Sequence, residues 1–348
     1  MAHARWVVGI IISAIALYIA FVGVDWPAVG DALGAANYWL LLAALPVLFG
    51  YTLMRAQRWR LLFYPDTHIS LLSAFGALNI GYMAGAVLPL QLGELARVYV
   101  LSDREKLPAG RVLSTVAIER LLDVFALLTI LAVLVPFIDL PAAAAISALI
   151  ILAGFVVFGG LVVIAVVDRP RVERWWMRLM RLMPERFRQR SQHLGHSLLD
   201  GLSALSNPRI LFLASFWTLA SWMTSSLVIY LALRAFSLDV PFAAAPFLLI
   251  ATTFGFFVPS SPGAIGVYHA ITIRSLTSVF SVPHDAAASY ALVVHALSLL
   301  PPTIFGAIFF WWYHLSLRRI SSLTEEELES TEEPPLELGM TPDSQAAP

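Results

Sequence analysis

Cysteine is missing altogether from this sequence of 348 residues. Its absence excludes disulfide bonds, thiol catalysis and cysteine-ligated metal sites, and it leaves the redox compartment undecided. Charged residues are also scarce: they make up 13% of the chain, against roughly 25% in a soluble domain. Because 59% of the residues are hydrophobic, the composition predicts an integral membrane protein.

Enzyme motifs are missing as well. The sequence holds no phosphate-binding glycine loop with lysine, no HExxH and no GxSxG. We expect no metal and no cofactor, and we do not expect an enzyme. Nucleic-acid binding is not expected either, because the basic residues flank apolar segments.

Six apolar segments have about the 20 residues that a spanning helix needs. They are 6–24, 38–57, 112–138, 142–167, 209–235 and 286–314. The first is followed by Asp25-Trp26-Pro27 and by no small-residue cleavage site, so we interpret it as a retained span and not as a signal peptide.

Two further apolar blocks, 70–101 and 243–281, are interrupted by one shared pattern. It reads GAVLPLQLG at Gly85–Gly93 and GFFVPSSPG at Gly255–Gly263. Proline and glycine break helical geometry, and a broken backbone at membrane depth must be buried in protein or line a wet cavity. We therefore predict two re-entrant hairpins that turn near Pro89 and Pro259, since matched interruptions of this kind mark transporter sites.

Basic residues predict the orientation. They lie at and just after the end of 38–57 (Arg55, Arg58 and Arg60), after 70–101, in a dense run at 169–190 and after the last span. The connections 25–37, 139–141 and 236–242 carry acids and no basic residue. With both blocks as hairpins, every basic loop and both termini fall in the cytoplasm. The sequence thus predicts an all-α polytopic membrane protein with six full spans and two opposed hairpins.

The order span, span, hairpin, span occurs twice in opposite directions, which predicts an inverted repeat formed by 1–140 and 141–317. The second half carries an insertion at 168–208, which reads either as an amphipathic helix on anionic lipid or as a basic loop without a lipid role. The acidic, proline-rich composition of 318–348 predicts a disordered cytoplasmic tail. Without the tail's eight acids, 22 basic and 15 acidic residues remain, a net charge of about +7 that suits anionic head groups.

Ionisable side chains inside membrane segments cost about 2.5–3.5 kcal/mol each and mark function by default. Glu94 and Arg97 lie just after the first break, and Glu119, Arg120 and Asp123 lie close together in 112–138. Their charges sum to −1, so internal pairing can leave one arginine edge for a ligand phosphate. The alternative is an ion network that holds hairpin to helix and binds no ligand.

The second break carries fewer charges. Ser260, Ser261, Pro262 and Gly263 form an unwound segment with hydroxyls and free backbone groups, which favours an anionic ligand at the helix start that follows. His269 lies at membrane depth, either as a packing residue or as part of a proton relay.

Three stretches carry a family likeness: LPLQLGELARVYVL at 88–101, STVAIERLLDVFALL at 114–128 and FVPSSPGAIGVYHA at 257–270. In these the chain resembles the lysylphosphatidylglycerol synthase transmembrane-region family, which includes MprF-type flippase domains and YbhN-like proteins. The resemblance covers nearly all of 6–314. It implies movement of lipids or lipid-linked head groups between leaflets, with an aminoacylated phosphatidylglycerol as cargo in the best-understood branch.

The resemblance also transfers site residues by position. They are Gly93, Glu94, Arg97, Glu119, Arg120, Asp123, Pro262, Gly263 and Gly266. This chain departs from the family pattern at His269, where a glutamate is usual, at Gln91, where a basic residue is common, and at Ala264, which replaces a frequent glycine. No aminoacyl-transfer domain follows in this sequence, so we expect no synthase activity.

The leading hypothesis is a lipid flippase in a bacterial plasma membrane. Arg97 and Arg120 would contact the lipid phosphate, while Glu94, Glu119 and Asp123 would orient them or receive a cationic head group. One alternative is a membrane enzyme that acts on a phospholipid or polyprenyl phosphate with a glutamate as base; another is a non-transporting membrane subunit. Expected partners are membrane lipids with anionic head groups, a second copy of the chain or a lipid-modifying enzyme.

Overall fold

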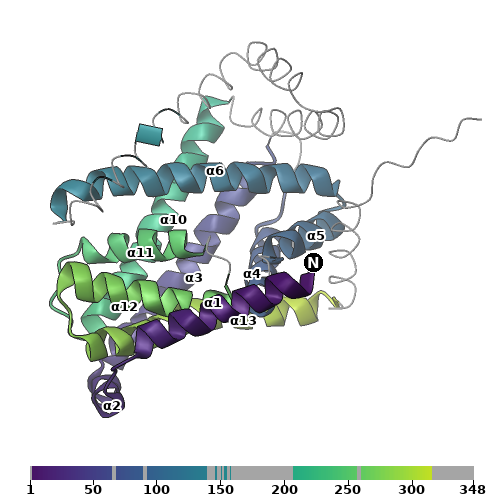
Figure 1. Cartoon of the computed structure of the whole chain (residues 1–348). Helices are drawn as coiled ribbons and strands as arrows, with labels where there is room; N and C mark the ends of the chain where they lie inside the picture. Colours follow the sequence, from purple (N-terminus) through teal and green to yellow (C-terminus); the bar gives the residue numbers. More distant parts are fainter. Residues whose placement is uncertain are drawn as a thin grey trace, which may run out of the picture.

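The computed structural model describes residues 2–64, 68–88, 92–138, 207–256 and 260–315, with a few positions between 146 and 157. All regular elements in these ranges are helical (Figure 1). The first half contains α1 (Ala2–Phe21), α2 (Trp26–Ala35), α3 (Tyr38–Leu61), α4 (Leu71–Val87), α5 (Gly93–Glu105), α6 (Ala109–Leu134) and the 3₁₀ turn η1 (Val135–Phe137). The second half contains α10 (Pro208–Ala235), α11 (Ala244–Gly255), the 3₁₀ turn η3 (Pro262–Ala264), α12 (Val267–Phe280) and α13 (His284–Trp312).

Four of these helices are long and apolar enough to cross a membrane: α3, α6 continued by η1, α10 and α13. The helices α1 and α2 are bent by 81° at their break and make a fifth candidate when they are taken as one span. The protein is therefore an integral membrane protein. The predicted span 142–167 lies largely outside the described residues, the insertion 168–208 lies outside them except for its last two residues, and the tail 318–348 lies entirely outside them. Six full spans remain a prediction.

The starts of α3 and α10 are set by the same local sequence device. The Asn37 side-chain oxygen accepts the backbone N–H groups of Trp39 (3.1 Å) and Leu40 (3.4 Å), which have no partner inside the helix. Asn207 caps α10 in the same way, and Pro208 takes the first helical position, where no N–H is needed. These two capped helices pack against each other.

The first interrupted block forms two antiparallel helices, α4 and α5. Gly85 lies opposite Gly93, and Gly81 lies opposite both Gly93 and the Arg97 side chain, so the two helices run in opposite chain directions. A Cβ at Gly93 would come within 2.3 Å of the Gly81 carbonyl oxygen. Only small residues allow this close approach of two helices.

The second interrupted block also forms a pair of helices. Its helices α11 and α12 are antiparallel, with Gly255 opposite Ile271 and Phe247 opposite Phe280. The predicted blocks 70–101 and 243–281 thus coincide with two helix pairs. Pro89 and Pro259 lie outside the described residues, and whether the pairs re-enter the same membrane face remains a prediction.

In Figure 1, α6 extends along one side of the molecule, α1 and α13 extend along the opposite side, and α3 and α10 pass between them. The buried apolar residues form two main clusters. One includes Val112 and Val116 of α6 with α4 and α5, and the other includes Ala126–Leu128 of α6 with α10 to α13. The predicted acidic side chains of α6, Glu119 and Asp123, lie between the two clusters, where α6 meets α3, α5 and α10.

Candidate functional site

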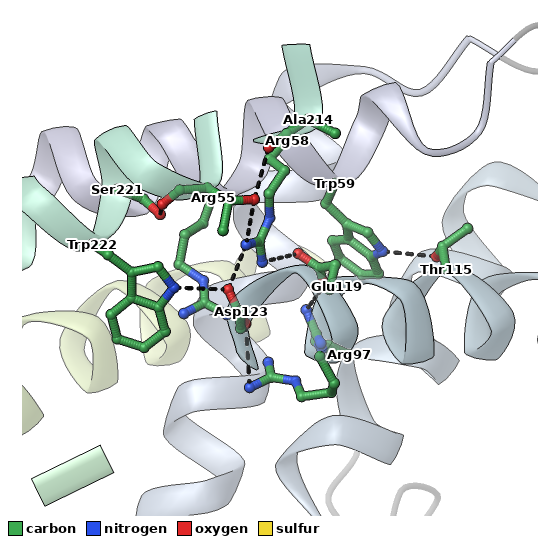
Figure 2. A network of polar contacts seen from close by, with 12 residues as sticks. Arg55, Arg58, Trp59, Arg97, Thr115, Glu119, Asp123, Ala214, Ser221 and Trp222 are labelled. Atoms are coloured by element: carbon green, nitrogen blue, oxygen red, sulfur yellow. Dashed lines mark hydrogen bonds and ion pairs between the residues drawn. The ribbon is translucent and has the colours of Figure 1, made fainter. Parts of the chain in front are cut away.

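A buried arginine from α3 begins the site. The Arg58 side chain is 0% exposed and donates to Asp123 (Nη1 to Oδ1, 2.5 Å) and to Glu119 (Nη2 to Oε1, 2.7 Å) on α6. Its Nη1 also donates to the Thr218 hydroxyl of α10 at 3.2 Å. One guanidinium therefore joins three helices (Figure 2).

Arg55 lies one turn earlier on α3. Its Nη2 donates to Asp123 Oδ2 at 3.2 Å, and its Nη1 donates to the Tyr51 hydroxyl at 2.9 Å. The guanidinium lies between two aromatic rings, 5.7 Å from the centre of Tyr51 and 5.8 Å from that of Trp222. The Trp222 indole N–H also donates to Asp123, at 3.1 Å. Both charge and cation–π contacts hold Arg55 in place.

The first helix pair contributes Arg97, from α5. Its Nε donates to Glu94 Oε2 at 2.8 Å, and its Nη1 donates to Glu119 Oε2 at 2.6 Å. The guanidinium carbon lies 4.8 Å above the Trp59 ring, whose own N–H donates to Thr115. Because Arg97 is buried, its guanidinium is not the arginine edge that the sequence predicts to be available for a ligand phosphate.

Arg120 is the exposed member of the network. Its side chain is 47% exposed and contacts Glu94 Oε1 at 3.1 Å and Asp123 Oδ2 at 3.6 Å. Glu94 is itself 38% exposed. The network is therefore closed on the side of Arg55, Arg58 and Arg97 and accessible along the edge formed by Arg120 and Glu94.

The charge of this cluster differs from the predicted one. The five predicted residues sum to −1, but the structure adds two arginines from α3, and four arginines against three carboxylates give +1. Buried charge is costly unless it is paired, so a surplus cation at membrane depth needs an explanation. Below we call these seven residues the arginine network; they are Arg55, Arg58, Glu94, Arg97, Glu119, Arg120 and Asp123.

The predicted residues of the second break form a separate group against α1 and α13. The Ser261 N–H donates to the Ser13 hydroxyl at 2.8 Å, and His295 Nε2 lies 2.9 Å from the Gly263 carbonyl oxygen. Gly266 has a φ of +94° and caps α12, where its N–H donates to His269 Nδ1 at 3.4 Å. His269 therefore shapes the turn.

The remaining predicted residues take structural places around these groups. Gly93 lies at the close contact of α4 with α5, Pro262 begins η3, and the Ser260 carbonyl packs on Gly9 of α1. Among the described residues, no hydrogen bond or ion pair joins the second group to the arginine network. A ligand role for either group remains a prediction.

Helix α4 lies against both groups. Gly81 faces Arg97, and a Cβ at Gly263 would lie 3.8 Å from the Ala86 carbonyl oxygen. Five residues of helix span about 7.5 Å. The turn of the second hairpin therefore packs on the first hairpin about that far along α4 from the network.

Sequence reasoning missed Arg55 and Arg58 as site residues, because it interpreted them as markers of a cytoplasmic loop. Both lie inside α3, within its last two turns, and both are buried. The available signal was their spacing of three, which places them on one helix face, together with the unbroken helical pattern. Thr218 and Trp222 carry no charge and gave no signal.

Residues 6–306 match the model of a family described as "Lysylphosphatidylglycerol synthase TM region". The chain belongs to this family. The match contains the whole arginine network and both helix pairs, and it confirms the resemblance drawn from the three motifs. No curated protein and no solved structure matches the chain. The family description points to a membrane protein of phospholipid metabolism or transport.

Proposed function

We propose that the protein is a lipid flippase of the cell membrane, which moves a phospholipid or a lipid-linked phosphate head group between leaflets. The observation that carries the proposal is the surplus cation of the arginine network and its exposed edge at Arg120. Arginine matches phosphate in geometry, since its planar fork donates two parallel hydrogen bonds.

The position of the network supports the same function. Asp123 is the central residue of the candidate span Ala109–Phe137, which has 29 residues. A phosphate that crosses the membrane must pass this depth, where an unpaired head group is most costly. A net positive site there lowers the barrier for an anionic group.

The packing of the helices supports an inverted repeat. When α3 to α6 are matched to α10 to α13, the contact of α3 with α4 corresponds to α10 with α11, and α5 with α6 corresponds to α12 with α13. The contact of α4 with α13 corresponds to α11 with α6, and α3 packs on α10 across the middle. Each half thus packs its hairpin on the last helix of the other half.

Such an exchange suits alternating access, in which two repeats rock against each other around a central site. The turn η3 of the second hairpin packs on α4 of the first, so motion of one hairpin is transmitted to the other. Both hairpins also contain close glycine contacts, which fix each helix pair as a unit.

Translocation of fluorescent phosphatidylglycerol in proteoliposomes tests the proposal, with dithionite bleaching as the readout. Arg120→Ala removes the exposed cation, and the buried Asp123 Oδ2 keeps its contact with Arg55, so we expect at least tenfold slower translocation in a folded protein. Arg209→Ala is the matched control, because Arg209 is an exposed arginine of α10 outside the network. Wild-type translocation by a folded Arg120→Ala variant would remove the proposed site.

A further inference from the structure

Every carboxylate oxygen of the arginine network has a partner. The three carboxylates have six oxygen atoms, and each of them contacts an arginine nitrogen. These contacts are Glu94 with Arg97 and Arg120, Glu119 with Arg58 and Arg97, and Asp123 with Arg55, Arg58 and Arg120. Asp123 accepts a further bond from Trp222.

The donors are not fully used. Arg55 Nε, Arg58 Nε and the Tyr82 hydroxyl are buried and have no hydrogen-bond partner among the described residues. Such groups are rare, because a buried polar atom without a partner loses about 1–3 kcal/mol of hydration. The partner missing from the network is therefore an acceptor, and the net charge of +1 makes an anionic acceptor the matching species.

Tyr82 brings an uncharged donor to this cluster from α4. Its hydroxyl lies within electrostatic range of Arg55, Tyr51, Arg97 and Arg120. Tyr51 is already bonded to Arg55, whereas the Tyr82 hydroxyl has no partner within the described part of the chain. Arg120, on the exposed edge of the network, is among the neighbours of this hydroxyl.

We propose that Tyr82 and Arg55 form the phosphate-binding subsite of the arginine network, with the Tyr82 O–H donating to a non-bridging phosphate oxygen. An ionised phosphodiester has several acceptor oxygens and no donor on its phosphate, which fits a cluster with surplus donors. A cationic head group has the opposite chemistry and does not fit here. That this phosphate belongs to a lipid rests on the proposed function.

Tyr82→Phe removes the hydroxyl and keeps the ring, so it separates binding from stability. A structural hydroxyl would cost stability when removed, whereas removal of an unpartnered one leaves the melting temperature unchanged or raises it. We expect that result in nanodiscs of phosphatidylcholine alone. With phosphatidylglycerol added, we expect about tenfold weaker lipid binding than in the wild type, as for one lost hydrogen bond to a charged group.

Tyr290→Phe is the matched control. Tyr290 is also buried, but its hydroxyl has a partner, because it donates to the Ile229 carbonyl at 3.4 Å. We expect this variant to keep the wild-type response to phosphatidylglycerol and to melt at the same or a lower temperature. The two variants thus differ in lipid binding, which only Tyr82→Phe weakens, and only Tyr290→Phe can lower the melting temperature.

Three ligand arms separate the sources of phosphate: phosphatidylglycerol, phosphatidylcholine and inorganic phosphate. A response to either anion that Tyr82→Phe weakens supports the subsite, and a response to inorganic phosphate alone counts against lipid as the ligand. If lipid binding depends on Tyr82 but the wild-type protein does not translocate lipid, the proposed subsite is supported and the proposed flippase function is refuted. Two results overturn the inference. One is that Tyr82→Phe binds phosphatidylglycerol as the wild type does; the other is that Tyr82→Phe loses stability in phosphatidylcholine alone to the same extent as it loses lipid binding.

Discussion

Arg58 of α3 and Asp123 of α6 are joined through Nη1 and Oδ1 at 2.5 Å, and both side chains are buried. The same guanidinium contacts Glu119, and the same carboxylate accepts from Trp222 of α10. The pair therefore ties the helix that carries the predicted acids to the two helices that pack across the middle of the molecule. Its loss should affect the fold before it affects any ligand.

We expect Arg58→Met to destabilise the protein by about 3–5 kcal/mol, the range measured when one partner of a buried ion pair is removed. Methionine keeps much of the volume but leaves two buried carboxylates with fewer donors. Unfolding in detergent micelles measures the change, with Arg209→Met as control, since Arg209 is exposed. A loss below about 1 kcal/mol would mean that the network relaxes around the gap.

Gly93→Ala should disrupt the first hairpin. The new Cβ would come within 2.3 Å of the Gly81 oxygen and 2.8 Å of the Gly85 nitrogen, and both are backbone atoms that cannot rotate away. We expect a loss of about 1–3 kcal/mol, as for overpacking.

Gly110→Ala is the matched control for that change. Gly110 lies in the first turn of α6, and a Cβ there meets nothing within 4 Å. Alanine forms helix better than glycine, so we expect equal or higher stability, by up to about 1 kcal/mol. Similar behaviour of the two variants would show that the close contact of α4 with α5 is not maintained in the membrane.

The sequence predicted the helix pairs well, because their signal is local. The shared glycine and proline pattern predicts a break within each of the blocks 70–101 and 243–281, and these blocks agree with α4–α5 and α11–α12, whereas Pro46 and Pro301, which lie outside this pattern, lie inside helices. The ion pairs of Glu94 with Arg97 and of Arg120 with Asp123 follow from their spacing of three. These parts of the fold and site need no knowledge of tertiary packing.

The rest of the site depends on which helices cross, and that is not local. Arg55 and Arg58 reach Asp123 because α3 packs beside α6 and α10, and basic residues near a span end are normally counted as loop charges. The role of His269 depends on the positive φ of Gly266, a backbone conformation that sequence spacing does not reveal. Tyr82 is unremarkable until the partners around its hydroxyl are known.

Glu94→Gln tests whether the exposed edge of the arginine network binds the anionic phosphate or a cationic part of the lipid head group. Glu94 contacts both Arg97 and Arg120, and its neutralisation changes the net charge of the network from +1 to +2. If the edge binds phosphate, phosphatidylglycerol should bind about three- to tenfold more tightly, in line with a Coulomb term of ~1 kcal/mol for a partly solvated charge. Stability should change by less than about 1 kcal/mol, because Glu94 is 38% exposed.

Binding of phosphatidylglycerol in nanodiscs measures this effect, and Glu105→Gln is the control, because it removes the same charge near the end of α5 outside the network. Tighter binding in Glu94→Gln alone assigns the edge to the phosphate. Weaker binding of an aminoacylated phosphatidylglycerol, with unchanged binding of the unmodified lipid, would instead assign Glu94 to a cationic head group. The two lipids differ in the esterified amino acid, which carries the cationic charge, so the comparison tests whether the carboxylate contacts that charge.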